Sequence, residues 1–508
     1  MSETAPEPLQ GAALWIAGFA LALANFVVVL DITVTAVAVP HIAGSLAVSP
    51  SQGTWTITSY AVAEAISVPL TGWLAMRFGT VRWFMISLFG FGFFSMWCGF
   101  APSLGFLVAG RVFQGLLGGP MMPLTQSLLI RIFPPEKQPI ALGLWAITTV
   151  CAPVIGPIVG GQISDNWSWP WIFFINLPVI GFSLFVVSRN LPRFETPRVK
   201  MPIDIVGLLL LISWVGAFQI MLDTGQEHGW FESGQVVVMA VIAAIAFAAF
   251  LIWEWTEPHP MVDVRMIKNT GFALATLAMS ITYGAFIGLI VLVPIWLQQT
   301  MGYSATLAGN TMAFMGVLAI VAAPLSAIAM TKIDVRITIS AAIIWMAAVS
   351  LMRAGWSTDS TFWMLALPQF LQGFAIPFYF MGSTALALGT VQSNQITSAA
   401  GLMSFVRTLI GAVATALITA NWIDMTRGTR AEIVPSLNGS SDTIGSLQAR
   451  GMTMDQARAM IDRMVEVQAN TVAMTHIFLW LATLFALSAA LVWFVPKLKG
   501  PVAMGEGH

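Results

Sequence analysis

The chain has 508 residues, of which 57% are hydrophobic and only 9% are Asp, Glu, Lys or Arg. Soluble domains carry about 25% charged residues, so this composition excludes an ordinary soluble globule and indicates an integral membrane protein. The formal net charge of −1 gives no reason to expect a nucleic-acid partner. The two cysteines, Cys98 and Cys151, lie within apolar runs, where a disulfide framework is not expected.

Hydrophobic segments predict an all-α protein, because a helix of about 20 apolar residues spans a bilayer and open strands cannot satisfy their backbone in lipid. The first segment follows MSETAPEPLQGAAL, which lacks a basic leader, and we expect it to remain as a span. The sequence predicts fourteen spans, at residues 13–39, 54–76, 82–101, 104–131, 138–163, 170–189, 203–222, 235–255, 270–299, 305–331, 336–356, 361–388, 396–423 and 474–496.

The distribution of Lys and Arg predicts the orientation of these spans, since cytoplasmic loops are enriched in basic residues. With the N-terminus inside, fourteen of the 22 basic residues fall in cytoplasmic segments, and only Arg353 falls in a short outer loop. Both termini, residues 1–12 and 497–508, are then expected in the cytoplasm, and residues 424–473 form a long outer loop.

An internal repeat relates the two halves at an offset of 258 residues, which maps Gln114-Gly115 onto Gln372-Gly373. The matched spans have the same orientation, so the repeat is parallel and predicts a substrate site between the halves near mid-membrane. The expected organisation is an N-terminal six-helix bundle (13–200), two linking transmembrane helices (201–260) and a C-terminal six-helix bundle (261–496) that includes the outer loop.

Two opposite charges fall within the spans of the N-terminal bundle. At a rise of about 1.5 Å per residue, Asp31 and Arg111 lie at similar depth, toward the outside of the membrane centre. Each relieves the desolvation of the other, so we expect them to pair. Ionisable groups inside a membrane indicate function by default, which favours a site for the coupling ion; the alternative is a fixed strut between helices.

Three further polar residues are candidates within spans. Glu64 lies near mid-membrane and is either a cavity-facing site for a cation or proton or a hydrogen-bonded structural group. Arg407 could bind an anionic substrate, although a structural role, with bonds to backbone carbonyls, is favoured. Gln372 joins Arg407 as a candidate for substrate binding or coupling in the C-terminal half.

The fifth span contains an unusual run of glycine and proline. Gly156 and Gly160 form a pair that permits close helix approach, and prolines remove backbone donors and bend a helix. This pattern suits a helix at a moving interface between the halves, and ordinary tight packing is the alternative. The residues concerned are Pro153, Gly156, Pro157, Gly160 and Gly161.

These motifs resemble those of the major facilitator superfamily, in particular its 14-helix drug:proton antiporter branch of the EmrB/QacA type. LDITVTAVAVP (30–40) is similar to the span-one motif, with Asp31 at the acidic position. RVFQGLLGGP (111–120) is similar to the span-four motif, which includes Gln114 and Gly115, and GPIVGG (156–161) to the antiporter motif of span five. The resemblance covers nearly the whole chain.

One motif departs from the family pattern. The loop between spans two and three keeps Gly72, Arg77, Gly79 and Arg82 but has Met76 where the family usually carries an Asp. The charge network that this Asp usually joins must therefore be absent or rebuilt, which leaves the gating role of the loop open.

The long outer loop contains TMDQARAMIDRMVEVQ, in which Thr453 and Gln456 have the spacing of a capping box. A short amphipathic helix is expected, either docked on the outer surface of the protein or in contact with a partner. Its apolar face comprises Ala457, Met460, Ile461, Met464 and Val465. The resemblance implies that the partner is a periplasmic adaptor of the EmrA type, connected to an outer-membrane channel of the TolC type.

The function implied is proton-driven export of hydrophobic and amphipathic toxic compounds through the bacterial inner membrane by alternating access. Asp31 would carry the coupling proton, Arg111 would tune its release and Glu64 would contribute to proton or substrate binding. No nucleotide motif, metal cluster or nucleophile elbow is present, so we expect a secondary transporter without catalytic residues or cofactors, in contact with membrane lipids. The alternatives are a proton-coupled importer on the same fold and a membrane receptor or scaffold.

Overall fold

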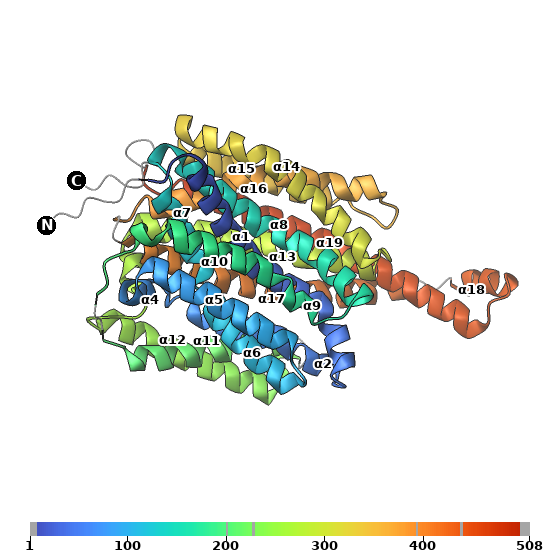
Figure 1. Cartoon of the computed structure of the whole chain (residues 1–508). Helices are drawn as coiled ribbons and strands as arrows, with labels where there is room; N and C mark the ends of the chain where they lie inside the picture. The colour runs from blue at the N-terminus through green and yellow to red at the C-terminus, as the bar shows by residue number, and fades with distance from the viewer. Residues whose placement is uncertain (1–7, 200–201, 226–228, 393–394, 437–439, 498–508) are drawn as a thin grey trace.

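The computed structural model describes residues 8–199, 202–225, 229–392, 395–436 and 440–497. Residues 1–7 and 498–508, most of the predicted cytoplasmic tails (1–12 and 497–508), lie outside this range. Within the described residues the chain is helical and contains no strand. The helices run along one another in an elongated bundle (Figure 1), as expected for a chain whose backbone must satisfy its own hydrogen bonds in lipid.

The N-terminal six-helix bundle contains six spans, three of which are interrupted. α3 and α4 together form the second span, α6 and α7 the fourth, and α9 and α10 the sixth. The bounds are α1 (Gly11–Ser45), α2 (Pro50–Gly53), α3 (Trp55–Ser67), α4 (Thr71–Phe78), α5 (Thr80–Gly99), α6 (Leu104–Gly118), α7 (Met121–Ile132), α8 (Gln138–Asn166), α9 (Trp171–Phe174) and α10 (Asn176–Asn190).

Two linking helices and six further spans follow. Short 3-10 turns lie in the connections along the chain: η1 (Pro135–Lys137), η2 (Pro192–Phe194), η3 (Trp230–Glu232) and η4 (Val264–Lys268). The bounds are α11 (Ile205–Gly225), α12 (Gly234–Thr256), α13 (Thr270–Gln299), α14 (Ala305–Lys332), α15 (Val335–Arg353), α16 (Phe362–Leu388), α17 (Ile396–Ser436), α18 (Ser440–Ala449) and α19 (Met454–Val492).

The spans agree with the fourteen predicted from hydropathy. Among the described residues, eleven helical segments are long and apolar enough to cross a membrane, and bent α8 adds a twelfth. The interrupted pairs α3/α4 and α6/α7 coincide with the two remaining predicted segments. The fold is therefore two six-helix bundles joined by two extra transmembrane helices.

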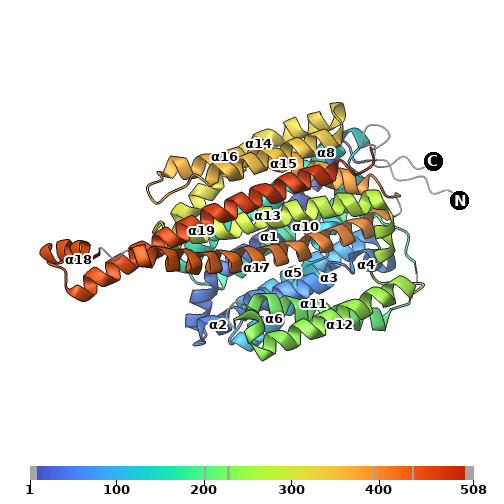
Figure 2. The ribbon, with the colours of Figure 1, turned by 180° about the vertical axis from the view of Figure 1, so that it is seen from behind.

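The predicted outer loop is different from what we expected. α17 and α19 continue far past the predicted span ends at 423 and 474, and with α18 they form a helical hairpin that projects from one end of the bundle (Figures 1 and 2). The capping box of Thr453 and Gln456 is present, but the helix it starts is continuous with the last span, so the prediction of a short separate helix is wrong. The loop is rich in helix-forming residues, and a polar sequence does not by itself end a helix.

The apolar face predicted for this helix is only partly buried. Ala457 and Val465 are buried, and Arg430 on α17 pairs with Asp462 on α19 at 2.5 Å. Met460 and Met464 are 43% and 56% exposed. We call this end of the molecule the hairpin end, and the opposite end, which carries the loop between α4 and α5, the loop-motif end.

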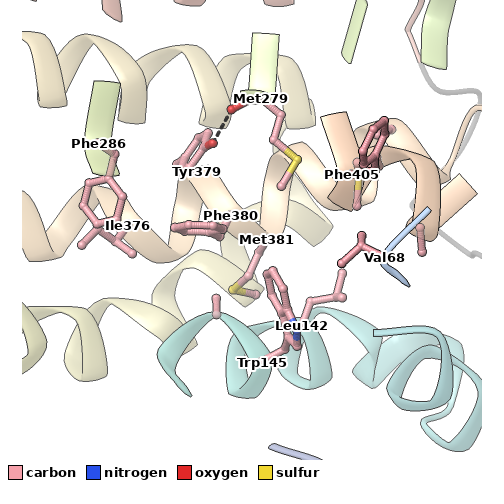
Figure 3. Close-up of a cluster of buried hydrophobic side chains, with 14 of the residues drawn as sticks. Val68, Leu142, Trp145, Met279, Phe286, Ile376, Tyr379, Phe380, Met381 and Phe405 are labelled. Atoms are coloured by element: carbon pink, nitrogen blue, oxygen red, sulfur yellow. Dashed lines mark hydrogen bonds between the residues drawn. The ribbon is translucent and has the colours of Figure 1, made fainter. Parts of the chain in front are cut away.

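The two halves meet through an apolar core. Figure 3 shows Leu142 and Trp145 of α8 facing Phe380 and Met381 of α16, and the rings of Trp145 and Phe380 are 6.0 Å apart. On the other side, the phenol of Tyr379 donates a hydrogen bond to the carbonyl of Met279 on α13 (Figure 3). The core thus joins one helix of the N-terminal half to two of the C-terminal half.

Candidate functional site

A buried charge network lies inside the N-terminal bundle. The structure pairs Arg111 of α6 with Asp31 of α1, as predicted, and the two residues are 0% and 1% exposed. The second carboxylate oxygen, Oδ1, accepts hydrogen bonds from Gln114 Nε2 at 3.1 Å and from Asn176 Nδ2 at 2.7 Å. Gln114 also accepts from Arg111 Nη1 at 2.8 Å. Such donors are needed, because a buried ion pair offsets its desolvation only when its remaining groups are also bonded.

Arg111 also connects this network to α3. Its Nε donates to the carbonyl of Thr56 at 3.0 Å, and its guanidinium lies 4.2 Å from the ring centre of Tyr60. The remaining nitrogen, Nη2, has no hydrogen-bond partner among the described residues. The network therefore joins α1, α3, α6 and α10, and any change in the charge of Asp31 acts on all four helices.

Asn176 is the member of this network that sequence reasoning missed. It begins α10, is 1% exposed and also donates to Ser95 Oγ at 3.0 Å. The available signal was a lone amide in the apolar run FFINLP at the start of a span, where an unpaired polar group is costly.

Glu64 faces a cavity of about 410 Å³. The walls come from α3, α11, α13 and α17, so the cavity lies between the two halves and includes a linking helix. Among the described residues, no hydrogen bond joins the Glu64 carboxylate to another side chain. Of the two alternatives for Glu64, the geometry favours the cavity-facing group.

Arg407 occupies a central position on α17 and is 1% exposed. Its guanidinium stacks on Trp145 of α8 at 5.3 Å and on Tyr283 of α13 at 5.1 Å, and Nη2 lies 2.7 Å from the sulfur of Met122 on α7. Arg407 Nε and Nη1 have no hydrogen-bond partner among the described residues. The prediction that Arg407 bonds to backbone carbonyls is therefore wrong. Arg407 is instead held by aromatic faces, with two donors unused beside a wall residue of the cavity, Tyr283.

Gln372 belongs to a separate cluster. Its Oε1 accepts from Arg353 Nη1 at 3.2 Å, and Gln369 Oε1 accepts from Arg353 Nη2 at 2.8 Å. The prediction that Arg353 lies in an outer loop is wrong: it is the last residue of α15 and is fully buried. The described contacts do not bring Gln372 and Arg407 together.

The loop motif after the second span is completed by a distant residue. Glu195, which follows α10, accepts hydrogen bonds from the backbone N–H groups of Val81 and Arg82, both at 3.0 Å, at the start of α5. Val199 N also donates to the carbonyl of Met76 at 3.0 Å. A carboxylate at a helix N-terminus is favourable. Glu195 thus supplies a carboxylate to this loop, and backbone N–H groups hold it there.

Glycines shape the same loop-motif end. Gly79 has φ of +92°, and a Cβ there would lie 2.5 Å from Glu195 Oε1. A Cβ on Gly72 would lie 2.8 Å from the Cα of Ser398 on α17. Arg77 stacks on the Trp73 ring at 5.2 Å, whereas Arg82 is exposed.

The halves are in close contact at the loop-motif end. Besides the approach of Gly72 to α17, the hydroxyls of Ser127 on α7 and Thr397 on α17 are 2.9 Å apart. The cavity beside Glu64 extends instead along α17 from Thr408 to Thr419, toward the hairpin end. This conformation is thus closed at the loop-motif end and hollow on the other side of the centre.

The glycines of the fifth span face α1 rather than the other half. A Cβ on Gly156 would lie 2.0 Å from Thr33 Oγ1, and one on Gly160 would lie 2.9 Å from the carbonyl of Val34, whereas Gly161 has more space. α8 bends by 44° between its segments ending at Pro153 and beginning at Ile158. The side chain of Pro157 lies outside the described part of the structure.

The opposite face of α8 contacts the C-terminal half. A Cβ on Gly309 of α14 would lie 2.9 Å from Ile158 Cγ1, and one on Gly143 would lie 3.3 Å from the sulfur of Met381. α8 is therefore an interface helix, as predicted, but its glycine stripe packs it within its own half.

Comparisons with known proteins agree with this architecture. The family model described as "Major Facilitator Superfamily" matches residues 21–416. The chain is 39% identical over 506 residues to the multidrug export protein EmrB of Escherichia coli K12, which covers 99% of this chain and 98% of that protein. It is 38% identical over 505 residues to the fatty acid resistance protein FarB of Neisseria gonorrhoeae, with 98% and 99% covered.

Solved structures support the fold. The proton:xylose symporter XylE superposes with a TM-score of 0.60 over 97% of this chain and 98% of that chain, at 12% sequence identity. The human organic anion transporter MFSD10 gives a TM-score of 0.59 over 95% of this chain and 100% of that chain, at 14% identity. At these identities the likeness concerns the fold alone.

Proposed function

Because the chain belongs to the Major Facilitator Superfamily and to its EmrB-type multidrug transporters, we propose that it exports hydrophobic and amphipathic toxic compounds in exchange for protons. It is a multi-pass membrane protein and a transporter rather than an enzyme. The proposal places it in the bacterial inner membrane with both termini in the cytoplasm, consistent with the positive-inside distribution of its basic residues.

The buried Asp31 network is the observation that carries this proposal. While Asp31 is ionised, Arg111, Gln114 and Asn176 hold it and tie α1 to α6 and α10. Protonation removes the counter-ion of Arg111, and removing one partner of a buried ion pair costs about 3–5 kcal/mol. This cost destabilises the present helix arrangement and favours another one, and such a change in conformation is what coupling to a proton requires.

The cavity offers a route by which ligand and proton affect each other. Glu64 lies in its wall on α3, the same helix that Arg111 reaches through Thr56 and Tyr60. A ligand that shifts α3 therefore shifts a partner of Asp31. The bend in α8 and its contacts with both halves suit alternating access.

The projecting hairpin supports the further proposal of a tripartite system. It extends well beyond the bundle and exposes Met460 and Met464 on α19. We assign to it the contact with a periplasmic adaptor of the EmrA type, which would lead to a channel of the TolC type. A photoreactive residue at position 464 is expected to cross-link such an adaptor, whereas one at lipid-facing position 345 is not; equal yields at both positions would contradict the assignment.

The test is proton release from detergent-purified protein when a hydrophobic toxin is added. We expect release from the wild type and none from Asp31→Asn, with Asp359→Asn, an exposed loop residue, as the matched control. Equal release by wild type and Asp31→Asn would make the pair a strut and turn attention to Glu64. In vesicles, uptake driven by outside acidification would favour an importer, and drug accumulation unaffected by Asp31→Asn would favour a receptor or scaffold.

A further inference from the structure

A second carboxylate lines the cavity beside Glu64, and it comes from a linking helix. Asp223, Leu222 and Gln219 of α11 form one of its walls. Gln219 Nε2 donates to Asp223 Oδ1 at 3.1 Å, and the Thr58 hydroxyl also hydrogen-bonds the carboxylate. The cavity volume of about 410 Å³ lies within the range of roughly 300–1,000 Å³ typical of small-molecule sites.

The position of Asp223 is unfavourable for the isolated protein. It lies two residues before the end of α11 at Gly225, where the helix dipole disfavours a negative charge by about 0.3–1 kcal/mol. Among the described residues, no Lys, Arg or His forms an ion pair with it; only hydroxyl and amide groups contact it. The side chain is exposed to the cavity, so its charge is open to a ligand.

The charges at the inner end of the cavity are arranged differently. Glu64 lies in the electrostatic field of both Arg111 and Arg407. Arg407 is 1% exposed, stacks on the wall residue Tyr283 and keeps two unpartnered nitrogens. The inner carboxylate therefore has two arginines in its surroundings, whereas no Lys, Arg or His among the described residues pairs with Asp223.

The rest of the lining is mostly apolar. Ala61, Ala65, Ile287 and Ala412 contribute aliphatic surface, interleaved with threonine hydroxyls along α17. A ligand with an apolar body and a single positive charge matches this distribution, because its body buries aliphatic surface while its charge meets Asp223.

We propose that Asp223 is a binding residue for lipophilic cations, such as quaternary ammonium or phosphonium compounds, and that Gln219 orients its carboxylate. The linking helix α11 is then part of the substrate site rather than a spacer between the bundles. This inference rests on the proposed function, since it names a substrate class for the same cavity.

The experiment compares two ions of matched size and opposite charge, tetraphenylphosphonium and tetraphenylborate. Their dissociation constants are measured by titration calorimetry on the full-length protein in nanodiscs. The variants are Asp223→Asn, the conservative Asp223→Glu, Gln219→Ala and the exposed-loop control Asp359→Asn, each checked for an unchanged elution profile and melting temperature.

We expect Asp223→Asn to weaken tetraphenylphosphonium binding about tenfold, the size of one partly exposed ionic contact, and to leave tetraphenylborate binding unchanged or stronger. Asp223→Glu should recover most of the loss, and Gln219→Ala should lose a smaller part. Cation affinity within twofold of wild type in Asp223→Asn would overturn the inference, as would a wild type that does not bind the cation. The proposed function is judged separately, by proton release from wild type and Asp31→Asn with an uncharged toxin.

Discussion

Gly72 controls how closely the halves approach at the loop-motif end. A Cβ at this position would lie 2.7 Å from Ser398 Oγ and 2.8 Å from Ser398 Cα, and backbone cannot yield as a flexible side chain can. Gly72→Val adds two further methyl groups at this contact, and overpacking of this kind costs about 1–3 kcal/mol. The cost falls only on the conformation in which α4 touches α17, so the closed state should lose about 5- to 150-fold in population relative to the open one.

Disulfide trapping measures this shift directly. Ser127→Cys and Thr397→Cys place thiols at a contact whose native oxygens are 2.9 Å apart, in a background where Cys98 and Cys151 are replaced by Ala. Gly72→Val should slow cross-linking at least fivefold, whereas Gly181→Val, at a helical glycine with no atom within 4 Å of its added Cβ, should leave it unchanged. Equal rates in the two variants would refute the idea that Gly72 sets closure.

Two further predictions concern residues that hold the bundle in place. Asn176→Ala removes a 2.7 Å hydrogen bond to a buried carboxylate and should cost about 1.5–3 kcal/mol of stability, measured as a lower melting temperature in detergent. The melting temperature of the control Asn190→Ala, which loses only a hydrogen bond within its own helix, should fall much less. Equal losses in the two variants would contradict the role of Asn176. Glu195→Ala removes the cap on α5 and should cost about 0.5–2 kcal/mol; a melting temperature equal to that of wild type would show that the cap contributes nothing.

Features that depend only on position along the chain or on depth in the membrane could be predicted from the sequence. Span positions follow from the length of apolar runs, and the depth of Asp31 and Arg111 follows from the rise per residue. Their pairing then needed only that buried opposite charges attract. The parallel repeat likewise placed the cavity between the halves.

Features that depend on helix rotation or distant contacts could not be predicted. Asn176 and Glu195 act on partners 145 and 114 residues away, and nothing in their local sequence names those partners. From the sequence, the glycines of α8 could face α1 or the C-terminal half, since a small residue indicates that another helix approaches closely but not which one. Asp223 lies at the end of a span, where an acidic residue normally contacts water, so its sequence position does not indicate a binding site.

The two halves match in sequence at several positions of the repeat but differ in their charged residues. At the offset of 258 residues, Gln114 corresponds to Gln372, while Arg111 corresponds to Gln369 and Asp31 to Leu289. Arg353 supplies a guanidinium to the C-terminal cluster from α15 rather than from α16, and its described contacts are amide and carbonyl oxygens.

Under the proposed function, this asymmetry indicates which side chains are candidates to carry the proton. Between residues 264 and 423 the only acidic residues are Asp334 and Asp359, and both lie in connections between helices. Up to residue 423, no carboxylate lies within a helix of the C-terminal half, and those of α17 and α19 lie from Asp424 on, toward the hairpin; Asp31, Glu64 and Asp223 belong to the N-terminal bundle and the linking helices. Under the proposed proton exchange, the N-terminal and linking-helix carboxylates are therefore the candidates for the titrating group, while Arg407, which stays protonated, supplies fixed positive charge from the C-terminal half. If the proposed function holds, we expect coupling to move these carboxylates relative to the fixed charge of Arg407.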